Sequence, residues 1–214
     1  MNSNLPVITS DDEDRFFQEA ASEDAGFGRI LSFAKGEYSI DKTPIKNGAE
    51  FRVNYKGWIK IWINFTTSPP TQMVYRVRRG EVPPERATLG DDVQSEWEIF
   101  NGKPKDPWVM QFLMPFEDTE TNEMVAFRTS SFGGRRALAE LVAVCANRAR
   151  HGEPAIPTVA LDVAHFTTKS FGKIAKPHFV IRGWEHDDAQ LACGEIDVEK
   201  IKPPRPEMND EIPF

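Results

Sequence analysis

The sequence predicts a mainly β fold with one α-helix, and three observations support this prediction. Residues 51–65 alternate between apolar and polar side chains without a break, which is the period-2 pattern of a strand with one buried face. Four shorter β-type runs follow at residues 108–116, 124–129, 158–166 and 174–184, and a helical pattern lies between the second and the third. With 214 residues and 40% hydrophobic content, the chain can build one sizeable core.

Charge divides the chain into three parts. Residues 1–28 carry one Arg against seven Asp and Glu, and residues 185–214 carry three basic residues against nine acidic ones. Residues 29–184 carry 22 Lys and Arg against 17 Asp and Glu, although the whole chain has a net charge of −7. We therefore expect an acidic disordered segment at 1–28, a basic domain at 29–184 and an acidic tail at 185–214. The basic core suits binding to phosphates, whereas the alternative is that the acidic ends serve solubility alone.

The polar face of residues 51–65 carries the expected binding site. This face presents Arg52, Lys56, Trp58, Lys60 and Trp62. Tryptophans two positions apart on one face of a strand stand about 6–7 Å apart, since the rise is about 3.3 Å per residue. Aromatic rings interleaved with cations are typical of proteins that bind single-stranded DNA without sequence preference, because every base has a face that can stack. The alternative is that both tryptophans pack beneath a second layer of the protein.

The order of the elements is that of an OB-fold, a five-stranded Greek-key barrel that binds oligonucleotides. Residues 73–79 read as an edge strand and residues 80–105 as a loop, while Ser130 and Ser131 are N-cap candidates for a helix that ends near Arg150. Three major strands, one helix and two further strands make up the OB-fold order. We therefore expect an OB-fold-like barrel at 29–184, with the long strand bending at Gly57.

Basic and aromatic residues outside the long strand complete the expected DNA-binding surface. They are Arg76, Arg78 and Arg79 at the end of the edge strand, Arg128, Arg135 at the helix start, and Lys169, Phe171 and Lys173 in the loop between the last two strands. This loop would clamp the DNA, unless it is an ordinary polar hairpin loop. Arg135 belongs to the run Gly133-Gly134-Arg135-Arg136, which is either a phosphate site or a structural helix start. It lacks the Lys-Ser/Thr of a Walker loop, so we expect no ATP binding.

Patterns for catalysis or metal binding are not found in the sequence. The titratable candidates are His151, His165, His178, His186, Cys145 and Cys193, and they form no HxH, HExxH or CxxC motif. Asp187 and Asp188 beside His186 fit a solvated acidic tail better than a metal site. We therefore expect no enzyme activity, no cofactor and no metal. The N-terminus does not resemble a signal peptide and no apolar run approaches a membrane span, so we expect a cytoplasmic protein without membrane contact.

The last seven residues resemble the C-terminal tip of bacterial single-stranded-DNA-binding proteins. Met208-Asn209-Asp210-Glu211-Ile212-Pro213-Phe214 places acidic residues before a final Ile-Pro-Phe, and phage single-strand binders also end in Phe after acids. In that family the tip docks on replication, recombination and repair proteins, with the Phe ring in an apolar pocket and the acids on a basic rim. Asn209 replaces an acid that is common in the family, and a long Gly/Gln-rich linker is missing. The resemblance therefore points to a phage or prophage protein in the host cytoplasm.

The sequence leads to one main hypothesis and two alternatives. The main hypothesis is sequence-tolerant binding of single-stranded DNA in replication or recombination, with partner proteins recruited through Asp210, Glu211, Ile212, Pro213 and Phe214. The first alternative is a phage-associated protein-interaction module that binds no nucleic acid. The second is a nuclease, which would need a cluster of metal ligands that the sequence does not display. A homo-oligomer is expected only by analogy with the resembled family.

Overall fold

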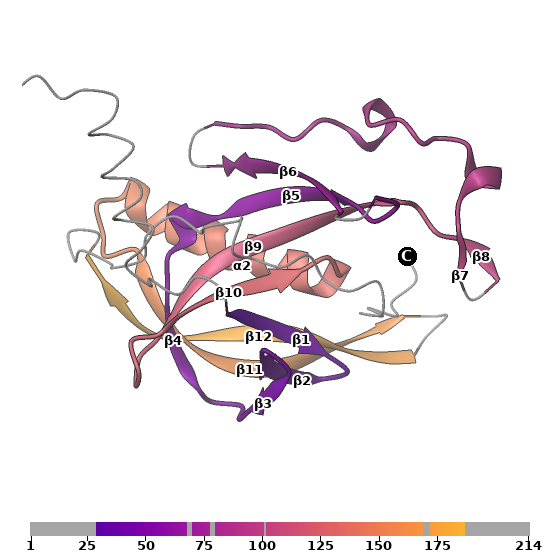
Figure 1. Cartoon of the computed structure of the whole chain (residues 1–214). Helices are drawn as coiled ribbons and strands as arrows, with labels where there is room; N and C mark the ends of the chain where they lie inside the picture. The colour runs from indigo at the N-terminus through magenta and orange to yellow at the C-terminus, as the bar shows by residue number, and fades with distance from the viewer. Residues whose placement is uncertain (1–28, 68–69, 78–79, 101, 169–171, 187–214) are drawn as a thin grey trace, which may run out of the picture.

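The computed structural model describes residues 29–67, 70–77, 80–100, 102–168 and 172–186. These residues are mainly β, which confirms the predicted fold class (Figure 1). The large sheet contains β1 (Ile30–Ala34), β2 (Glu37–Ile40), β3 (Thr43–Ile45), β4 (Glu50–Val53), β5 (Ile59–Asn64), β6 (Thr71–Arg76), β9 (Trp108–Asp118), β10 (Met124–Thr129), β11 (Ile156–Thr168) and β12 (Gly172–Glu185). Outside it lie the hairpin β7 (Ile99–Phe100) and β8 (Lys103–Pro104), the helix α2 (Phe132–Arg150) and the 3-10 turns η1 (Tyr55–Gly57), η3 (Arg86–Thr88) and η4 (Gln94–Glu96).

The large sheet is open. Its strand order is β12-β11-β4-β9-β10-β1-β2-β3, and β5 attaches to β9 while β6 attaches to β5. In a closed barrel every strand has a neighbour on both edges. Among the described strands, β3, β6 and β12 each pair along one edge only. The mainly β core is therefore as expected, whereas the closed five-stranded barrel of an OB-fold is not observed.

The expectation of one unbroken strand over residues 51–65 is wrong. The run forms β4, the turn η1 and then β5, and both strands pair with the same edge of β9. The backbone N–H of Gly57 donates to the side-chain Oδ1 of Asn54 at 3.1 Å, which closes the turn. A Cβ at Gly57 would lie 2.6 Å from Cγ of Pro115 in β9, so only glycine fits here without displacing the proline. Gly57 is the bending point that the sequence predicts, but the bend separates two strands.

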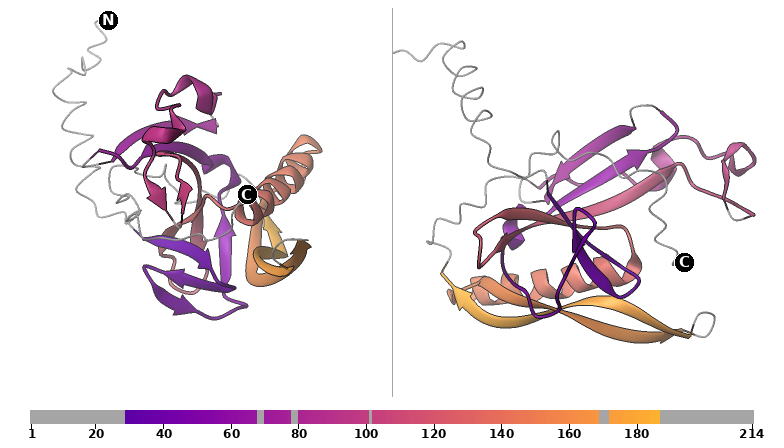
Figure 2. Two further views of the ribbon diagram at one scale, coloured as in Figure 1. Left: turned by 90° about the vertical axis from the view of Figure 1, so that its right-hand side faces the viewer. Right: turned by 60° about the horizontal axis from the view of Figure 1, so that its bottom comes forward.

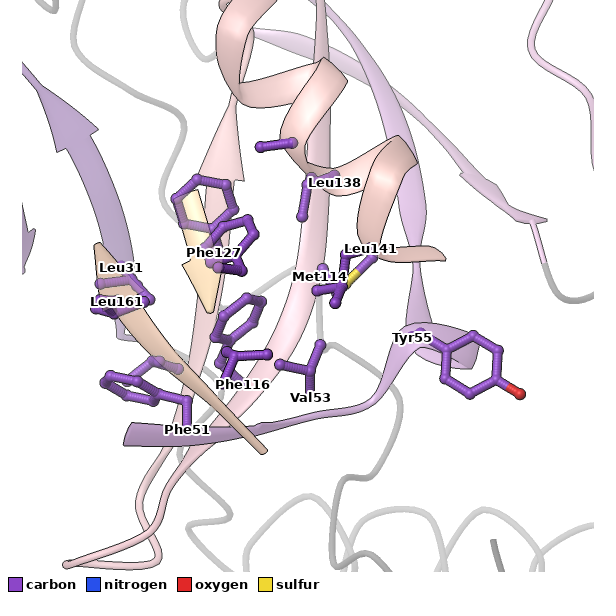
Figure 3. Close-up of a cluster of buried hydrophobic side chains, with 14 of the residues drawn as sticks. Leu31, Phe51, Val53, Tyr55, Met114, Phe116, Phe127, Leu138, Leu141 and Leu161 are labelled. Carbon is purple, nitrogen blue, oxygen red and sulfur yellow. The ribbon is translucent and has the colours of Figure 1, made fainter. Parts of the chain in front are cut away.

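The main core lies between α2 and the sheet strands that face it. Figure 3 shows Leu138 and Leu141 of α2 beside Met114 of β9, with Phe127 and Phe116 deeper in the same cluster. All five side chains are nearly or fully buried. Burial of large apolar side chains contributes about 1.5–3 kcal/mol each, so this cluster contributes substantially to stability.

The start of α2 is built for close packing. Ser131 is the N-cap, as predicted, and its Oγ accepts a hydrogen bond from the Gly134 N–H at 3.1 Å. A Cβ at Gly134 would lie 2.0 Å from Oγ1 of Thr129, and one at Gly133 would lie 2.9 Å from Cβ of Lys176. The two glycines therefore let the helix approach β10 and β12 closely, which is the structural interpretation of this run.

Several elements were not expected from the sequence. The strands β1, β2 and β3 lie in residues for which no strand was predicted, and β1 runs parallel to β10 with Ile30 opposite Ala126. The hairpin β7–β8 lies inside the expected loop at 80–105. No helix in the part of the chain that the structure describes is long and apolar enough to span a bilayer.

Candidate nucleic-acid interface

Trp62 lies in the interior, so the expectation that it stands on an exposed face is wrong. Its side chain is 9% exposed, and its indole Nε1 donates to the carbonyl oxygen of Pro84 at 3.0 Å. Nearby, Oδ2 of Asp91 accepts hydrogen bonds from Trp108 Nε1 and from Asn64 Nδ2, both at 3.0 Å. These hydrogen bonds hold the segment between β6 and β9 against this end of the sheet. For Trp62 this matches the alternative in which the tryptophans pack beneath a second layer of the protein.

The adjoining part of the same face remains partly exposed and combines aromatic rings with cations. Trp58 and Phe112 are both half-buried, with ring centroids 5.9 Å apart and planes inclined by 37°. Nζ of Lys60 lies 5.6 Å from the centroid of each ring. Cζ of Arg135 lies 5.8 Å from the Phe112 ring. We name Trp58, Lys60, Phe112 and Arg135 the aromatic–cationic cluster.

The surface of the aromatic–cationic cluster continues onto β6 through Tyr75. Tyr75 pairs with Lys60, and Lys60 pairs with Phe112, in antiparallel register. Residues directly opposite each other on neighbouring strands project from the same face, and the strands are about 4.8 Å apart. Tyr75, Lys60 and Phe112 therefore form a line across three strands, and all three are half-buried. Lys60 makes no ion pair with a carboxylate of the described residues.

The indole of Trp58 has an unmet hydrogen bond. Its Nε1 is buried and has no acceptor, while the ring packs against the main core. Leaving a buried donor unpaired costs about 1–3 kcal/mol.

The other predicted binding residues do not gather at this cluster. Arg52 is held by ion pairs to Glu117 at 2.9 Å and to Glu185 at 3.0 Å, both of which neutralise its charge. Lys56 lies 6.0 Å from the ring of the preceding Tyr55.

Arg76 and Arg128 project from the opposite face of the sheet. Arg76 pairs with Ile59, and Arg128 pairs with Leu113, whereas Lys60 lies on the other face of β5. Lys173 is exposed near the start of β12. The remaining predicted binding residues, which lie outside the described residues, are Arg78, Arg79, Lys169, Phe171, Asp210, Glu211, Ile212, Pro213 and Phe214.

Phe112 and Tyr75 were missed by the sequence reasoning. Phe112 lies in the mostly apolar run of β9 and reads as a core residue, and its position beside Lys60 follows only from the pairing of β9 with β5. Tyr75 lies in the expected edge strand, but only its neighbours Arg76, Arg78 and Arg79 were predicted to bind DNA. Cross-strand register is the missing signal in both cases.

Titratable groups elsewhere offer no competing site in the described part of the chain. Cys145 is buried in the main core, and burial raises the pKa of its thiol to about 12, which makes it unreactive. His178 lies 3.3 Å from Asp162 on the surface. The backbone N–H of Val163 and then the His178 ring hold the pKa of Asp162 below its usual value. Over the described residues, His, Cys, Asp and Glu form no group of three that could hold a metal ion. Asp187, Asp188 and Cys193 lie outside this part.

Comparison with known proteins does not identify a family for this chain. No family model matches the chain, and no curated protein and no solved structure matches it. The chemistry of the aromatic–cationic cluster is therefore the basis for a functional proposal.

Proposed function

We propose that the protein binds single-stranded DNA without sequence preference, and that the aromatic–cationic cluster together with Tyr75 is the contact surface. The observation that carries this proposal is the position of Lys60, which lies 5.6 Å from two partly exposed aromatic rings. Base stacking on an aromatic ring contributes about 1–3 kcal/mol per base, and cations attract the phosphates between the bases. Trp62 has no part in the surface because it is buried.

The ring geometry favours stacking from outside over insertion of a base. A base sandwiched between two rings needs about 7–8 Å between them, since contacting carbons are about 3.5–4.0 Å apart. The Trp58 and Phe112 centroids are 5.9 Å apart, so no base fits between them. Bases can therefore stack only on the outward sides of the two rings, which are inclined by 37°. Lys60 and Arg135 then lie within reach of the connecting phosphates.

The proposal does not require a closed barrel. Sheet faces with aromatic side chains bind single strands in folds other than the OB-fold, because stacking needs only a flat patch of rings. The relationship to OB-fold proteins remains a prediction from element order. A role in replication or recombination, and a phage origin, remain predictions from the C-terminal resemblance.

A fluorescence titration tests the proposal. Adding poly-dT to the full chain is expected to quench tryptophan fluorescence, because Trp58 would stack on bases. The affinity should fall with salt, with a log–log slope of about −0.7 per phosphate contacted. Absence of salt-sensitive quenching would refute DNA binding at this surface. Degradation of the oligonucleotide only with Mg²⁺ would favour the nuclease alternative.

Removal of residues 212–214 separates the tip from the DNA surface. We expect the shortened chain to lose recruitment of replication and repair proteins, since the Phe214 ring and carboxylate are the proposed anchors. Its DNA affinity, measured by anisotropy with labelled dT, should be equal or slightly higher because the anionic tail competes less. Glu207→Gln, which lies outside the tip, is the control. A marked loss of DNA affinity would contradict this division of roles.

A second candidate is a protein-interaction module. It is favoured by apolar side chains exposed on the segment between β6 and β9, where Val82 is 82% and Ile99 is 63% exposed. Phe100 beside Ile99 is also exposed. A contiguous exposed apolar patch is a common mark of protein contacts, and Ile99 and Phe100 are neighbours in β7. This candidate predicts no fluorescence change with poly-dT.

A further inference from the structure

The sheet has a second buried apolar face, opposite the face that α2 covers. Its cluster consists of Ile59, Ile61, Ile63, Leu113 and Ala126, none of which is more than 4% exposed. The partly buried residues that pack against it are Ile30, Phe65, Val74 and Met124. We name these nine residues the second apolar face.

No hydrophobic side chain from another described element packs against this face. All nine residues belong to β1, β5, β6, β9 and β10 or directly follow β5, so they lie side by side in one layer. Side chains in one layer leave their tips open unless a second layer packs about 10 Å above. The helix packs on the opposite face, against the main core, and it lies beside β11 and β12 at the right of the left view of Figure 2. The low exposure of Ile61 and Leu113 therefore needs a cover from elsewhere.

We propose that residues 1–28 of the same chain are this cover. The chain enters the sheet at this face, because Ile30 belongs to it and the carbonyl oxygen of Arg29 accepts a hydrogen bond from Ala126 N–H at 2.9 Å. Residues 1–28 include Phe16, Phe17 and Phe27, which supply apolar surface close to that entry point.

The C-terminal segment is a poorer candidate by position. It begins after β12, which is separated from β9 by β11 and β4 in the strand order. The short gaps at 68–69, 78–79, 101 and 169–171 contain too few residues to cover five strands. Residues 1–28 therefore combine sufficient length with the nearest attachment.

Charge and hydrogen bonding agree with this assignment. Residues 1–28 carry seven acids against one Arg, and Arg76 and Arg128 project from the face that the segment would cover. Oppositely charged rims around an apolar centre favour docking in one orientation. Gln111 pairs with Ile61 and so shares this face, and its Oε1 is buried without a hydrogen-bond partner. A donor from a docked segment could satisfy it.

The cover would leave the DNA surface open. Lys60 and Phe112 project from the opposite face to Ile59 and Leu113. Residues 1–28 would thus shield apolar surface without competing for DNA, although they are as acidic as a competing tail would be. Loss of the cover and loss of DNA binding are therefore separable.

Paramagnetic relaxation in the full chain tests the proposal. A spin label on Ser22→Cys, in a Cys193→Ser background that keeps the buried Cys145, should lower the methyl signals of Ile61 and Leu113 at least twofold. Those of Ile156 and Leu161 in β11 should change little. Phe16→Ser with Phe17→Ser should abolish the effect and raise the fluorescence of an apolar dye severalfold, with dT affinity unchanged. The matched control is Asn2→Ala with Asn4→Ala, which should alter neither.

Two outcomes would overturn the proposal. Attenuation of the same methyls from a label on native Cys193, with none from Ser22→Cys, would assign the face to the C-terminal segment. Spin-labelled chains can also be mixed with isotope-enriched chains that carry no spin label. Attenuation of the same methyls in that mixture would show that a second copy of the chain covers the face. Neither result depends on DNA binding, so failure of this proposal and failure of the proposed function are distinguishable.

Discussion

Trp58→Ala is expected to weaken binding of oligo-dT roughly 5- to 150-fold, the equivalent of about 1–3 kcal/mol for one lost stacking contact. The reason is that Trp58 forms one end of the ring surface beside Lys60, 5.9 Å from Phe112. Anisotropy of a fluorescein-labelled dT oligonucleotide measures the change without relying on tryptophan emission. Circular dichroism and a urea midpoint would establish that the variant folds.

Trp97→Ala is the matched control for this prediction. Trp97 is also half-buried and also has a cation near its ring, with Cζ of Arg86 at 5.7 Å. Arg86 is paired with Asp106 at 2.8 Å and with Asp92 at 3.1 Å, so its charge is not offered to phosphates. We expect dT affinity to stay within about twofold. Equal losses of dT affinity in Trp58→Ala and Trp97→Ala would contradict the assignment of DNA binding to the aromatic–cationic cluster.

Trp62→Ala is expected to lower the free energy of unfolding by about 3–5 kcal/mol, as truncation of a buried aromatic residue usually does. The variant also loses the hydrogen bond from Nε1 to Pro84, which holds the segment between β6 and β9 on the sheet. Urea denaturation followed by circular dichroism measures the loss. Trp62→Phe keeps most of the volume and should lose considerably less. A stable Trp62→Ala protein with weak DNA binding would instead indicate that Trp62 belongs to the binding surface.

Local patterns in the sequence predicted the elements that local physics determines. Met124–Thr129 was predicted with both of its ends, and Ser131 was predicted as an N-cap candidate for α2, because alternation and capping depend on neighbouring residues. The predicted strands at 158–166 and 174–184 were extended by the structure to β11 and β12, which pair along their whole length. Gly57 was expected to bend the chain, and Pro115 across the sheet explains why a glycine is needed there.

The candidate site depended on tertiary facts that the sequence does not carry. Alternation assigned Trp58 and Trp62 to one face, but it could not show that Pro84 and Asp91 would cover the end of that face and leave Lys60 open. It also could not show that Arg76 and Arg128 fall on the opposite face, since this follows from their register with β5 and β9. The strands β1, β2 and β3 have five residues or fewer and were missed. The pairing of β1 with β10 joins distant parts of the chain.

The pairing of β1 with β10 has a consequence for synthesis of the chain on the ribosome. Ile30 finds its partner Ala126 only about 100 residues later, and chains grow at about 5–20 residues per second. The meander of β1, β2 and β3 must therefore wait roughly 5 to 20 s with one edge and its apolar side chains unprotected. During that interval a nascent chain presents an open strand to its neighbours. Slower translation of residues 46–126 should increase aggregation of this protein.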